Sequence, residues 1–206
     1  MLHLGDITKI NGAEIPVVDV ITGGSPCQDL SIAGKRAGLA GERSGLFMEQ
    51  IRIVKEMREH ERRNGRTGYL CRPRYMVWEN VAGAFSSNEG KDFQAVLEEI
   101  IKIAEPECPD LSKIIEGGGV RWTKSGCVYD EMGKWSVAWR LHDSQFWNVP
   151  QRRARIAVVA DFGGLSAPEI LFERKGLRWN PEKGKGERQG AAGNPKTGTG
   201  ESDSEG

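Results

Sequence analysis

The feature that most constrains this chain is a short apolar stretch that ends in two glycines and leads to a cysteine. Residues 17–22 are largely apolar and β-branched, Gly23 and Gly24 follow them, and Pro26 and Cys27 come next. Such a stretch favours a buried strand, and the glycines favour a tight turn. We therefore predict a buried strand over 17–22 that presents the thiol of Cys27 at its carboxyl end, where a nucleophile is commonly placed.

The composition is that of a globular protein with a modest core. The chain has 206 residues, enough for one ordinary domain, with 29 basic and 29 acidic side chains. The balanced charge argues against strong, non-specific affinity for nucleic acid, although it is compatible with a local basic groove. No apolar run approaches the ~18 residues of a membrane span, and the N-terminus does not have the pattern of a signal peptide. We expect a cytoplasmic protein with no membrane contact.

The cysteines and histidines do not have the spacing of a metal site. The cysteines are Cys27, Cys71, Cys108 and Cys127. The histidines are His3, His60 and His142. No Cys-x-x-C pair is present, so we expect free thiols and no metal. A hydrolase or redox protein that uses Cys27 stays an alternative, but it needs a histidine beside the thiol, and none stands in a recognisable pairing motif.

Further helices and strands follow from the spacing of apolar residues. We predict helices over 44–63, with Ser44 as the N-cap, and over 91–104. We predict strands over 74–78, 135–142 and 154–161, a loop over 64–74, and a loop excursion or small hairpin within 105–134. Alternating strands and helices indicate an α/β sheet with parallel neighbours.

The composition changes near residue 176. Glycine, lysine, glutamate, threonine and serine dominate the remainder, which has too few apolar side chains to bury. We therefore predict an ordered domain over 1–175 and a disordered tail over 176–206.

Three short motifs occur in order along the chain. They are Gly24-Ser25-Pro26-Cys27-Gln28, Glu79-Asn80-Val81 and Gln151-Arg152-Arg153-Ala154-Arg155. In an open α/β sheet, chemistry gathers at the carboxyl ends of the strands, so Cys27 and Glu79 are predicted to converge there. A thiol beside a carboxyl group indicates nucleophilic attack coupled to proton transfer.

Together these motifs resemble those of the DNA (cytosine-5) methyltransferase family. Two further segments add to the resemblance, which covers roughly residues 4–162. Gly5-Asp6-Ile7-Thr8 is similar to the segment that contacts the adenine of S-adenosylmethionine, and Arg43-Ser44-Gly45-Leu46-Phe47 is similar to the start of the helix after the cysteine loop. The resemblance implies a partial S-adenosylmethionine-dependent methyltransferase (Rossmann-like) sheet with flanking helices.

The resemblance also implies a role for each catalytic residue. The thiolate of Cys27 would add to C6 of a flipped cytosine and activate C5 as a nucleophile. Glu79 would hold the N3–N4 edge of the base, Arg155 would contact O2, and Arg153 would contact the nearby backbone or the active-site loop.

The remaining contacts implied by the family are those to cofactor and DNA. The residues expected to bind S-adenosylmethionine are Asp6, Ile7, Pro26 and Leu46. The residues expected to contact double-stranded DNA are Gln28, Ser31, Lys35, Arg36 and Gln151. The implied setting is bacterial or phage-encoded DNA methylation, including restriction–modification.

Some family segments do not match within this sequence. The strand with a Phe-x-Gly-x-Gly loop, the next strand with its acidic end, and the target-recognition domain are not found. In the family sheet the missing strands lie beside the cysteine strand, so we expect an exposed apolar edge there. Two hypotheses stay open: a second polypeptide supplies these segments, or the chain is an inactive remnant that binds DNA without methylating it. Both predict weak or no methyl transfer by the isolated chain.

Overall fold

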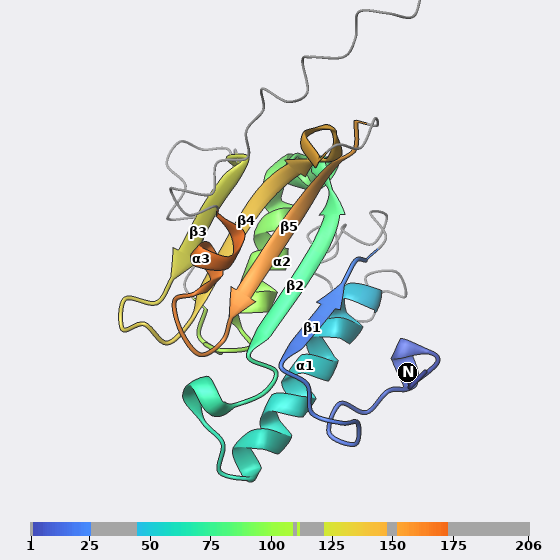
Figure 1. Cartoon of the computed structure of the whole chain (residues 1–206), viewed down its shortest axis with the longest axis vertical. Helices are drawn as coiled ribbons and strands as arrows, with labels where there is room; N and C mark the ends of the chain where they lie inside the picture. Colours follow the sequence, from blue (N-terminus) through green and yellow to red (C-terminus); the bar gives the residue numbers. More distant parts are fainter. Residues whose placement is uncertain (1, 26–44, 109–110, 112–121, 148–151, 173–206) are drawn as a thin grey trace, which may run out of the picture.

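The structure is a computed structural model that describes residues 2–25, 45–108, 111, 122–147 and 152–172. Its centre is a five-stranded sheet with the order β1-β2-β5-β4-β3 (Figure 1). The strands are β1 (Val20–Gly23), β2 (Tyr75–Val81), β3 (Ser125–Tyr129), β4 (Ser136–Asp143) and β5 (Ala154–Asp161). The helices are α1 (Gly45–Arg63), α2 (Lys91–Ile101) and α3 (Ala167–Leu171). Short 3₁₀ turns cover Ile7–Lys9, Gly68–Leu70, Ala82–Phe85, Ser87–Gly90 and Ser144–Trp147.

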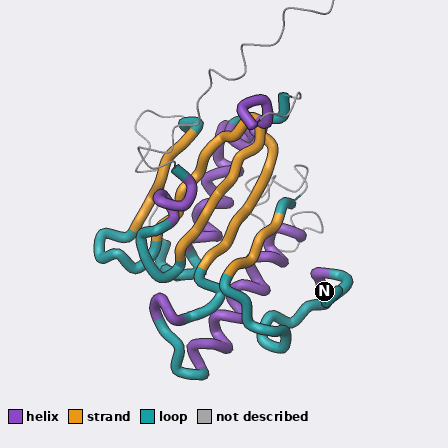
Figure 2. Tube along the Cα trace, in the orientation of Figure 1, coloured by secondary structure: helices purple, strands orange, loops and turns teal. Residues whose placement is uncertain are grey.

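The helices lie on the two faces of the sheet, as Figure 2 shows in outline. α1 and α2 cover one face, where they bury the larger core with β2, β4 and β5, and α3 covers the other face (Figure 1). The smaller cluster beneath α3 contains Ala138, Val159 and Ala167. This two-sided cover confirms the predicted mixed α/β class.

The predicted helices form where apolar side chains recur on one face. Phe47, Ile51, Val54 and Met57 of α1 are buried at helical spacing. The chain leaves this helix at Gly65, whose φ of +81° lies in the left-handed region that glycine adopts without strain. The predicted helix over 91–104 is confirmed as α2, although its regular part ends at Ile101.

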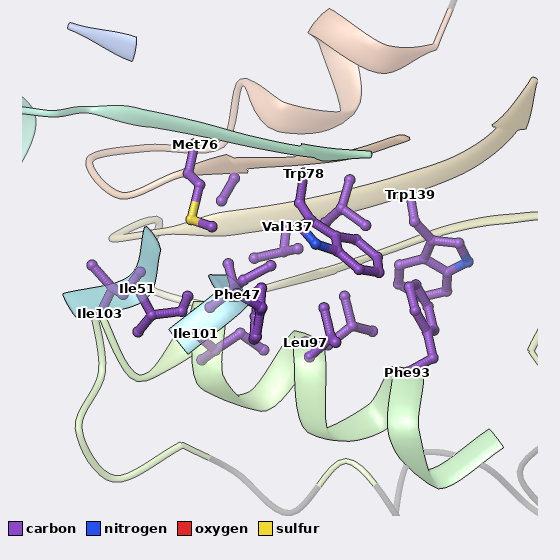
Figure 3. Close-up of a cluster of buried hydrophobic side chains, with 14 of the residues drawn as sticks. Phe47, Ile51, Met76, Trp78, Phe93, Leu97, Ile101, Ile103, Val137 and Trp139 are labelled. Atoms are coloured by element: carbon purple, nitrogen blue, oxygen red, sulfur yellow. The ribbon is translucent and has the colours of Figure 1, made fainter. Parts of the chain in front are cut away.

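An aromatic cluster joins β2 to the helices (Figure 3). Trp78 of β2 is fully buried, with its ring 5.9 Å from that of Phe47 and 6.4 Å from that of Phe93, measured between centroids. Phe93 in turn lies edge-on to Trp139 of β4, with 6.1 Å between the centroids. Edge-to-face contacts of this kind add about 0.5–1.5 kcal/mol per pair to the burial of the rings.

The sheet is mixed, and the prediction of parallel neighbours was wrong for most of it. Only β1 and β2 are parallel, whereas β2–β5, β5–β4 and β4–β3 are antiparallel. The physical reason is the length of the connections: residues 144–153 between β4 and β5 are fewer than the dozen or so that a parallel crossover needs. A small hairpin within 105–134 was one of the two predicted options. β3 lies in that range, but it pairs with β4, which begins at Ser136, so the observed hairpin extends beyond the predicted segment.

Two strand predictions need correction. The strand predicted over 17–22 is Val20–Gly23, and it is partly exposed because β1 lies at the edge of the sheet. Val17, Val18 and Val20 are each at least 40% exposed, which is the apolar edge that the sequence predicts. The strand predicted over 74–78 runs to Val81, because its pairing with β5 continues to the Val81–Arg155 register.

Several predictions fall on residues outside the described ranges. These are the N-cap at Ser44, the disordered tail over 176–206 and the domain boundary near 175. Within the described residues, no helix combines the length and apolarity that crossing a membrane requires.

A buried carboxylate fastens the end of the sheet where β2 begins and β5 ends. Nε and Nη2 of Arg74 donate to the two oxygens of Asp161 at 2.9 Å each, and Ser166 Oγ and the Gly163 N–H also donate to this carboxylate. Burial alone would raise the pKa of Asp161, but the bonds from Arg74, Ser166 and Gly163 outweigh it and hold the pKa below its ordinary value.

We predict that Asp161→Asn lowers the free energy of unfolding at pH 7 by about 2–4 kcal/mol, because Arg74 loses its buried partner. A depressed pKa stabilises the fold above the unfolded value of about 3.9, and this contribution disappears as the pH falls through the folded value. The difference between wild type and Asp161→Asn should therefore shrink below about pH 4. Urea unfolding between pH 7 and pH 3 measures it.

The control is Asp19→Asn, which removes the same type of ion pair at the surface. Asp19 pairs with Arg72, but its side chain is 74% exposed, so the expected loss is under about 1 kcal/mol. Equal losses for the two variants, or a difference that does not change with pH, would contradict the assignment.

Candidate active site

The parallel pairing of β1 and β2 places the glycine turn beside the Glu79-Asn80 segment. The last paired residues are Gly23 and Trp78, and the chains continue side by side beyond them. Asn80 Nδ2 donates to the carbonyl oxygen of Ser25 at 2.9 Å, and the Trp78 indole N–H donates to Ser25 Oγ at 3.1 Å. Ser25 is thus held at both its backbone and its side chain, two residues before Cys27 in the sequence.

Both donors are buried, which makes these bonds important for the position of the turn. Trp78 is 0% and Asn80 is 3% exposed. The Asn80 amide is fully used, because its Oδ1 also accepts the backbone N–H of Val81 at 2.7 Å. A buried polar group without a partner costs about 1–3 kcal/mol, so Ser25 cannot leave this position without leaving both donors unpaired.

The carboxylate of Glu79 pairs with Arg155 from the neighbouring strand. Arg155 Nε lies 2.8 Å from Glu79 Oε1, and both side chains are partly exposed. The antiparallel direction of β5 explains the pairing, because it places the first residues of β5 beside the last residues of β2. Two residues that are distant in sequence therefore meet at the carboxyl end of β2.

Gly24 brings the glycine turn into contact with this ion pair. A Cβ atom added at Gly24 would lie 3.1 Å from Glu79 Oε2 and 3.3 Å from the Glu79 carbonyl oxygen. A side chain at position 24 would therefore crowd Glu79.

The same turn borders a pocket of about 230 Å³. Its walls come from the end of β1, the first turns of α1 and the 3₁₀ turn near the N-terminus. The lining residues are Ile7, Ile21, Thr22, Gly23, Gly24, Ser25, Leu46, Gln50 and Ile53. Gly24 and Ser25 thus border the pocket and also contact Glu79, Trp78 or Asn80.

Two of the residues predicted to bind the cofactor, Ile7 and Leu46, meet in this pocket. Asp6 precedes Ile7 and caps its 3₁₀ turn, with Oδ1 accepting the backbone N–H of Thr8 at 3.0 Å and the Thr8 hydroxyl at 2.9 Å. These bonds hold the pKa of Asp6 below its ordinary value, so the exposed carboxylate is charged at neutral pH.

Among the predicted catalytic residues, the structure joins Glu79 to Arg155 but not to Arg153. Arg153 is exposed just before β5, and its backbone N–H donates to Ser144 Oγ at 3.1 Å. The remaining predicted site residues, among them the predicted nucleophile, lie outside the described ranges. They are Pro26, Cys27, Gln28, Ser31, Lys35, Arg36 and Gln151.

Sequence reasoning missed three residues of the site. Trp78 and Asn80 flank the predicted Glu79, and their alternation along β2 was the signal that they share a buried face. Gln50 has one weaker signal, since it is polar at a position where α1 faces the sheet and is only 5% exposed. No cluster of three or more potential metal ligands occurs among the described residues.

The first half of the chain matches a known family. Residues 1–104 match the model of the family described as C-5 cytosine-specific DNA methylase. The matched range includes the glycine turn, the Glu79-Asn80-Val81 segment and all of α2.

Individual relatives are proteins of phages and bacteria. The chain is 33% identical to a protein named DNA N-6-adenine-methyltransferase of Escherichia phage P1, over 86% of this chain and 25% of that protein. It is 29% identical to the orphan methyltransferase M.Rho11sI of Bacillus phage rho11s, over 89% of this chain and 26% of that protein. It is 28% identical to the type II methyltransferase M.BsuFI of Bacillus subtilis, over 82% of this chain and 31% of that protein. The chain therefore spans between a quarter and a third of the length of these relatives.

We predict that Asn80→Asp loosens the glycine turn, because the new carboxylate cannot donate to the Ser25 carbonyl oxygen. Backbone amides in the peptide that contains residues 20–25 should then exchange with deuterium about tenfold faster or more, as expected for the loss of about 1–2 kcal/mol of local stability. Hydrogen exchange followed by mass spectrometry measures this.

Asn64→Asp is the matched control, since Asn64 lies at the exposed end of α1 and its side chain contacts His60. It should leave exchange of the 20–25 peptide unchanged. Unchanged exchange in Asn80→Asp as well would mean that Asn80 does not hold the turn.

Proposed function

Because the chain belongs to the C-5 cytosine-specific DNA methylase family, we propose that it carries the nucleophile and cytosine pocket of a DNA (cytosine-5) methyltransferase. One observation carries the proposal. The turn that leads into Cys27 is pinned by Trp78 and Asn80, directly beside the Glu79–Arg155 pair. A nucleophile and a hydrogen-bonding carboxylate are the two groups that such a reaction needs.

The thiol of Cys27 is the proposed nucleophile. A free cysteine has a pKa of about 8.5, so a fraction is already thiolate near neutrality. Addition of this thiolate to C6 of cytosine forms a carbon–sulfur bond and moves electron density to C5, which otherwise is a poor nucleophile. Elimination of the C5 proton and the thiolate afterwards restores the aromatic ring and the free enzyme.

Glu79 and Arg155 are the proposed contacts to the base. Addition at C6 increases the negative charge on N3 and O2, so a carboxyl group that hydrogen-bonds the N3–N4 edge and a guanidinium near O2 stabilise it. In the structure these two side chains pair with each other while half of Glu79 is exposed. An incoming cytosine would insert between partners that already face one another, and the ion pair keeps both side chains near their working positions.

The pocket beside the glycine turn is the proposed site for part of S-adenosylmethionine. Its aliphatic walls from Ile7, Ile21 and Leu46, and its glycine floor at Gly23 and Gly24, fit a flat ring better than a charged group. When bound, the cofactor supplies an electrophilic methyl group. The contribution of this chain would be to hold the nucleoside against Leu46 and to keep water from that side of the turn.

The DNA contacts proposed from the sequence concern Gln28, Ser31, Lys35, Arg36 and Gln151. A flipped cytosine in double-stranded DNA is the proposed substrate, and extrusion of the base costs a few kcal/mol that such contacts offset. A second polypeptide that supplies further segments of the active protein stays a proposal, and an inactive chain that only binds DNA is the alternative.

A second candidate is methylation of adenine at N6, which the name of the phage P1 relative raises. That amino group is itself a nucleophile toward a methyl donor, so the reaction does not need a thiol that adds to the ring. The family match and the cysteine after the pinned turn favour cytosine. The two candidates differ in whether Cys27 becomes attached to DNA.

We predict that Cys27 forms a covalent adduct with duplex DNA that contains 5-fluorocytosine in the presence of S-adenosylmethionine. The fluorine at C5 blocks the final elimination, so even slow chemistry accumulates over hours as a trapped product. Mass spectrometry of the digested complex would locate the attachment.

Cys27→Ser should abolish the adduct, whereas Cys127→Ser, the matched change at an exposed cysteine of β3, should leave it unchanged. Binding of DNA without any adduct, with S-adenosylmethionine present, would favour the inactive DNA-binding alternative. Formation of N6-methyladenine without an adduct would favour the second candidate.

We predict that Glu79→Gln slows adduct formation at least about 100-fold, because an amide cannot share a proton with N3 as a carboxyl group does. The fold should be unaffected, since the side chain is half exposed. Glu89→Gln is the control, because Glu89 is exposed and pairs only with Lys91 in the described structure. A similar adduct rate for all three proteins would exclude a catalytic role for Glu79.

A further inference from the structure

Arg52 of α1 is a cation that the mechanism above does not use, and it lies at the centre of a set of hydrogen bonds. Its Nε donates to Glu49 Oε2 at 2.7 Å, and its Nη1 donates to Glu56 Oε1 at 2.8 Å. These carboxylates stand three residues before and four residues after it on the same helix, so they fix the direction of the guanidinium group. The same group also reaches residues 7–12, which we call the N-terminal strap.

The strap is joined to α1 by this arginine and one of its partner carboxylates. Arg52 Nη1 donates to the carbonyl oxygen of Ile10 at 2.8 Å, and Nη2 donates to that of Ile7 at 3.2 Å. The backbone N–H of Gly12 donates to Glu56 Oε2 at 2.7 Å. Within the described part of the chain, the hydrogen bonds between the strap and α1 thus all involve Arg52 or Glu56.

The strap has little apolar burial to hold it in place. Residues 2–19 are described throughout, and Gly12 is the only one of them that is buried. A Cβ added at Gly12 would lie 2.4 Å from the carbonyl oxygen of Ile53, so the strap backbone rests directly on α1 at this point. Figure 1 shows the N-terminal segment in blue, outside the sheet and beside α1. A segment with few buried apolar contacts opens at a low cost in free energy, so the position of the strap depends on its polar bonds.

The shape of the arginine side chain matters for this attachment. The guanidinium group presents its N–H donors in a planar fork, and here it serves two carbonyl oxygens and two carboxylates at once. A lysine ammonium group concentrates its donors at one point and cannot span the same partners. The side chains of Arg52, Glu49 and Glu56 are only a quarter to a third exposed, so water competes less for these bonds than at an open surface.

The strap carries one wall of the pocket of about 230 Å³ beside the glycine turn, because Ile7 lines that pocket. We propose that Arg52 is a positioning residue that holds the strap against α1 and thereby keeps Ile7 at the pocket. The inference rests on the proposed function, since that function assigns the pocket to part of the cofactor. Arg52 is not among the described residues that line the pocket, and it acts through the backbone of Ile7.

We expect Arg52→Lys to release the strap without unfolding the domain. Amide exchange of the peptide that contains residues 7–12, followed by mass spectrometry, should become at least about fivefold faster, whereas the urea midpoint should stay near the wild-type value. Arg62→Lys is the matched control, because Arg62 also lies on α1 and donates to a backbone carbonyl oxygen, that of Ile103. It should leave exchange of the strap unchanged.

The link between the strap and the pocket is measured with S-adenosylhomocysteine as the probe. Because the strap is weakly held, its release in Arg52→Lys brings the open form to a sizeable population, and only the closed form offers Ile7 to the ligand. The dissociation constant from equilibrium dialysis should therefore rise about two- to fourfold in Arg52→Lys and stay unchanged in Arg62→Lys. Gly12→Ala, which displaces the strap sterically with the arginine in place, should raise it in the same way.

The inference fails if strap amides of wild type exchange as in an unfolded peptide, or if Arg52→Lys leaves their exchange unchanged. It also fails if wild type does not bind S-adenosylhomocysteine, or if release of the strap leaves the dissociation constant unchanged. Loss of the fold in Arg52→Lys would show that Arg52 supports the whole domain, which contradicts a local role. An adduct at Cys27 together with any of these results would keep the proposed function and reject only the role of Arg52. A strap that behaves as expected in a chain that forms no adduct would keep the attachment and reject the function.

Discussion

The burial of Trp78 is the interaction on which both the core and the candidate site depend. Its ring packs against Phe47 and Phe93, and therefore fixes β2 to both helices on that face. Its indole N–H reaches in the other direction to Ser25 Oγ. Because the ring is fully buried, the turn before Cys27 takes its position from the core and not from a flexible side chain. Loss of packing around this ring would disturb stability and the active-site turn together.

The direction of β5 is the second constraint on the site. As an antiparallel strand beside β2, it places Arg155 at the carboxyl end of β2, where Glu79 lies. A parallel β5 would bring its carboxyl end there instead, and Arg155 would lie at the opposite end of the sheet. The buried Asp161–Arg74 pair fastens that opposite end. The Arg74–Asp161 pair therefore fixes β2 and β5 at one end of the sheet. The Glu79–Arg155 pair lies at the other end, in the candidate site.

The sequence was sufficient to predict where most helices and strands lie, but not the direction in which neighbouring strands run. Apolar runs located α1, α2, β4 and β5 closely, because burial of one face determines where such elements begin and end. Strand direction depends on connections and partners distant in the chain, so the predicted parallel sheet was wrong. In the same way, the burial of β1 was overestimated. A run of valines predicts a buried strand whether the strand lies inside the sheet or at its edge. The motifs predicted Glu79, Arg155, Ile7 and Leu46, which the structure places in the candidate site. Trp78, Asn80 and Gln50 required the fold, because a polar group that acts through its buried partner leaves no motif in the sequence.

The glycine turn connects the two halves of the proposed reaction. Gly24 lines the pocket and lies so near Glu79 that an added Cβ would be 3.1 Å from the carboxylate oxygen Oε2. Ser25 also lines the pocket, and it accepts hydrogen bonds from both Trp78 and Asn80. A single stretch of backbone therefore separates the proposed nucleoside site from the proposed base contacts. Because Gly24 has no side chain, no side chain at this position stands between the two proposed sites. Transfer of a group between two bound molecules requires their reacting atoms to come within about 3–3.5 Å. Glycine at position 24 leaves this space free of a side chain, and the hydrogen bonds to Ser25 hold the adjoining backbone in place. Both features favour a close approach of the two bound molecules.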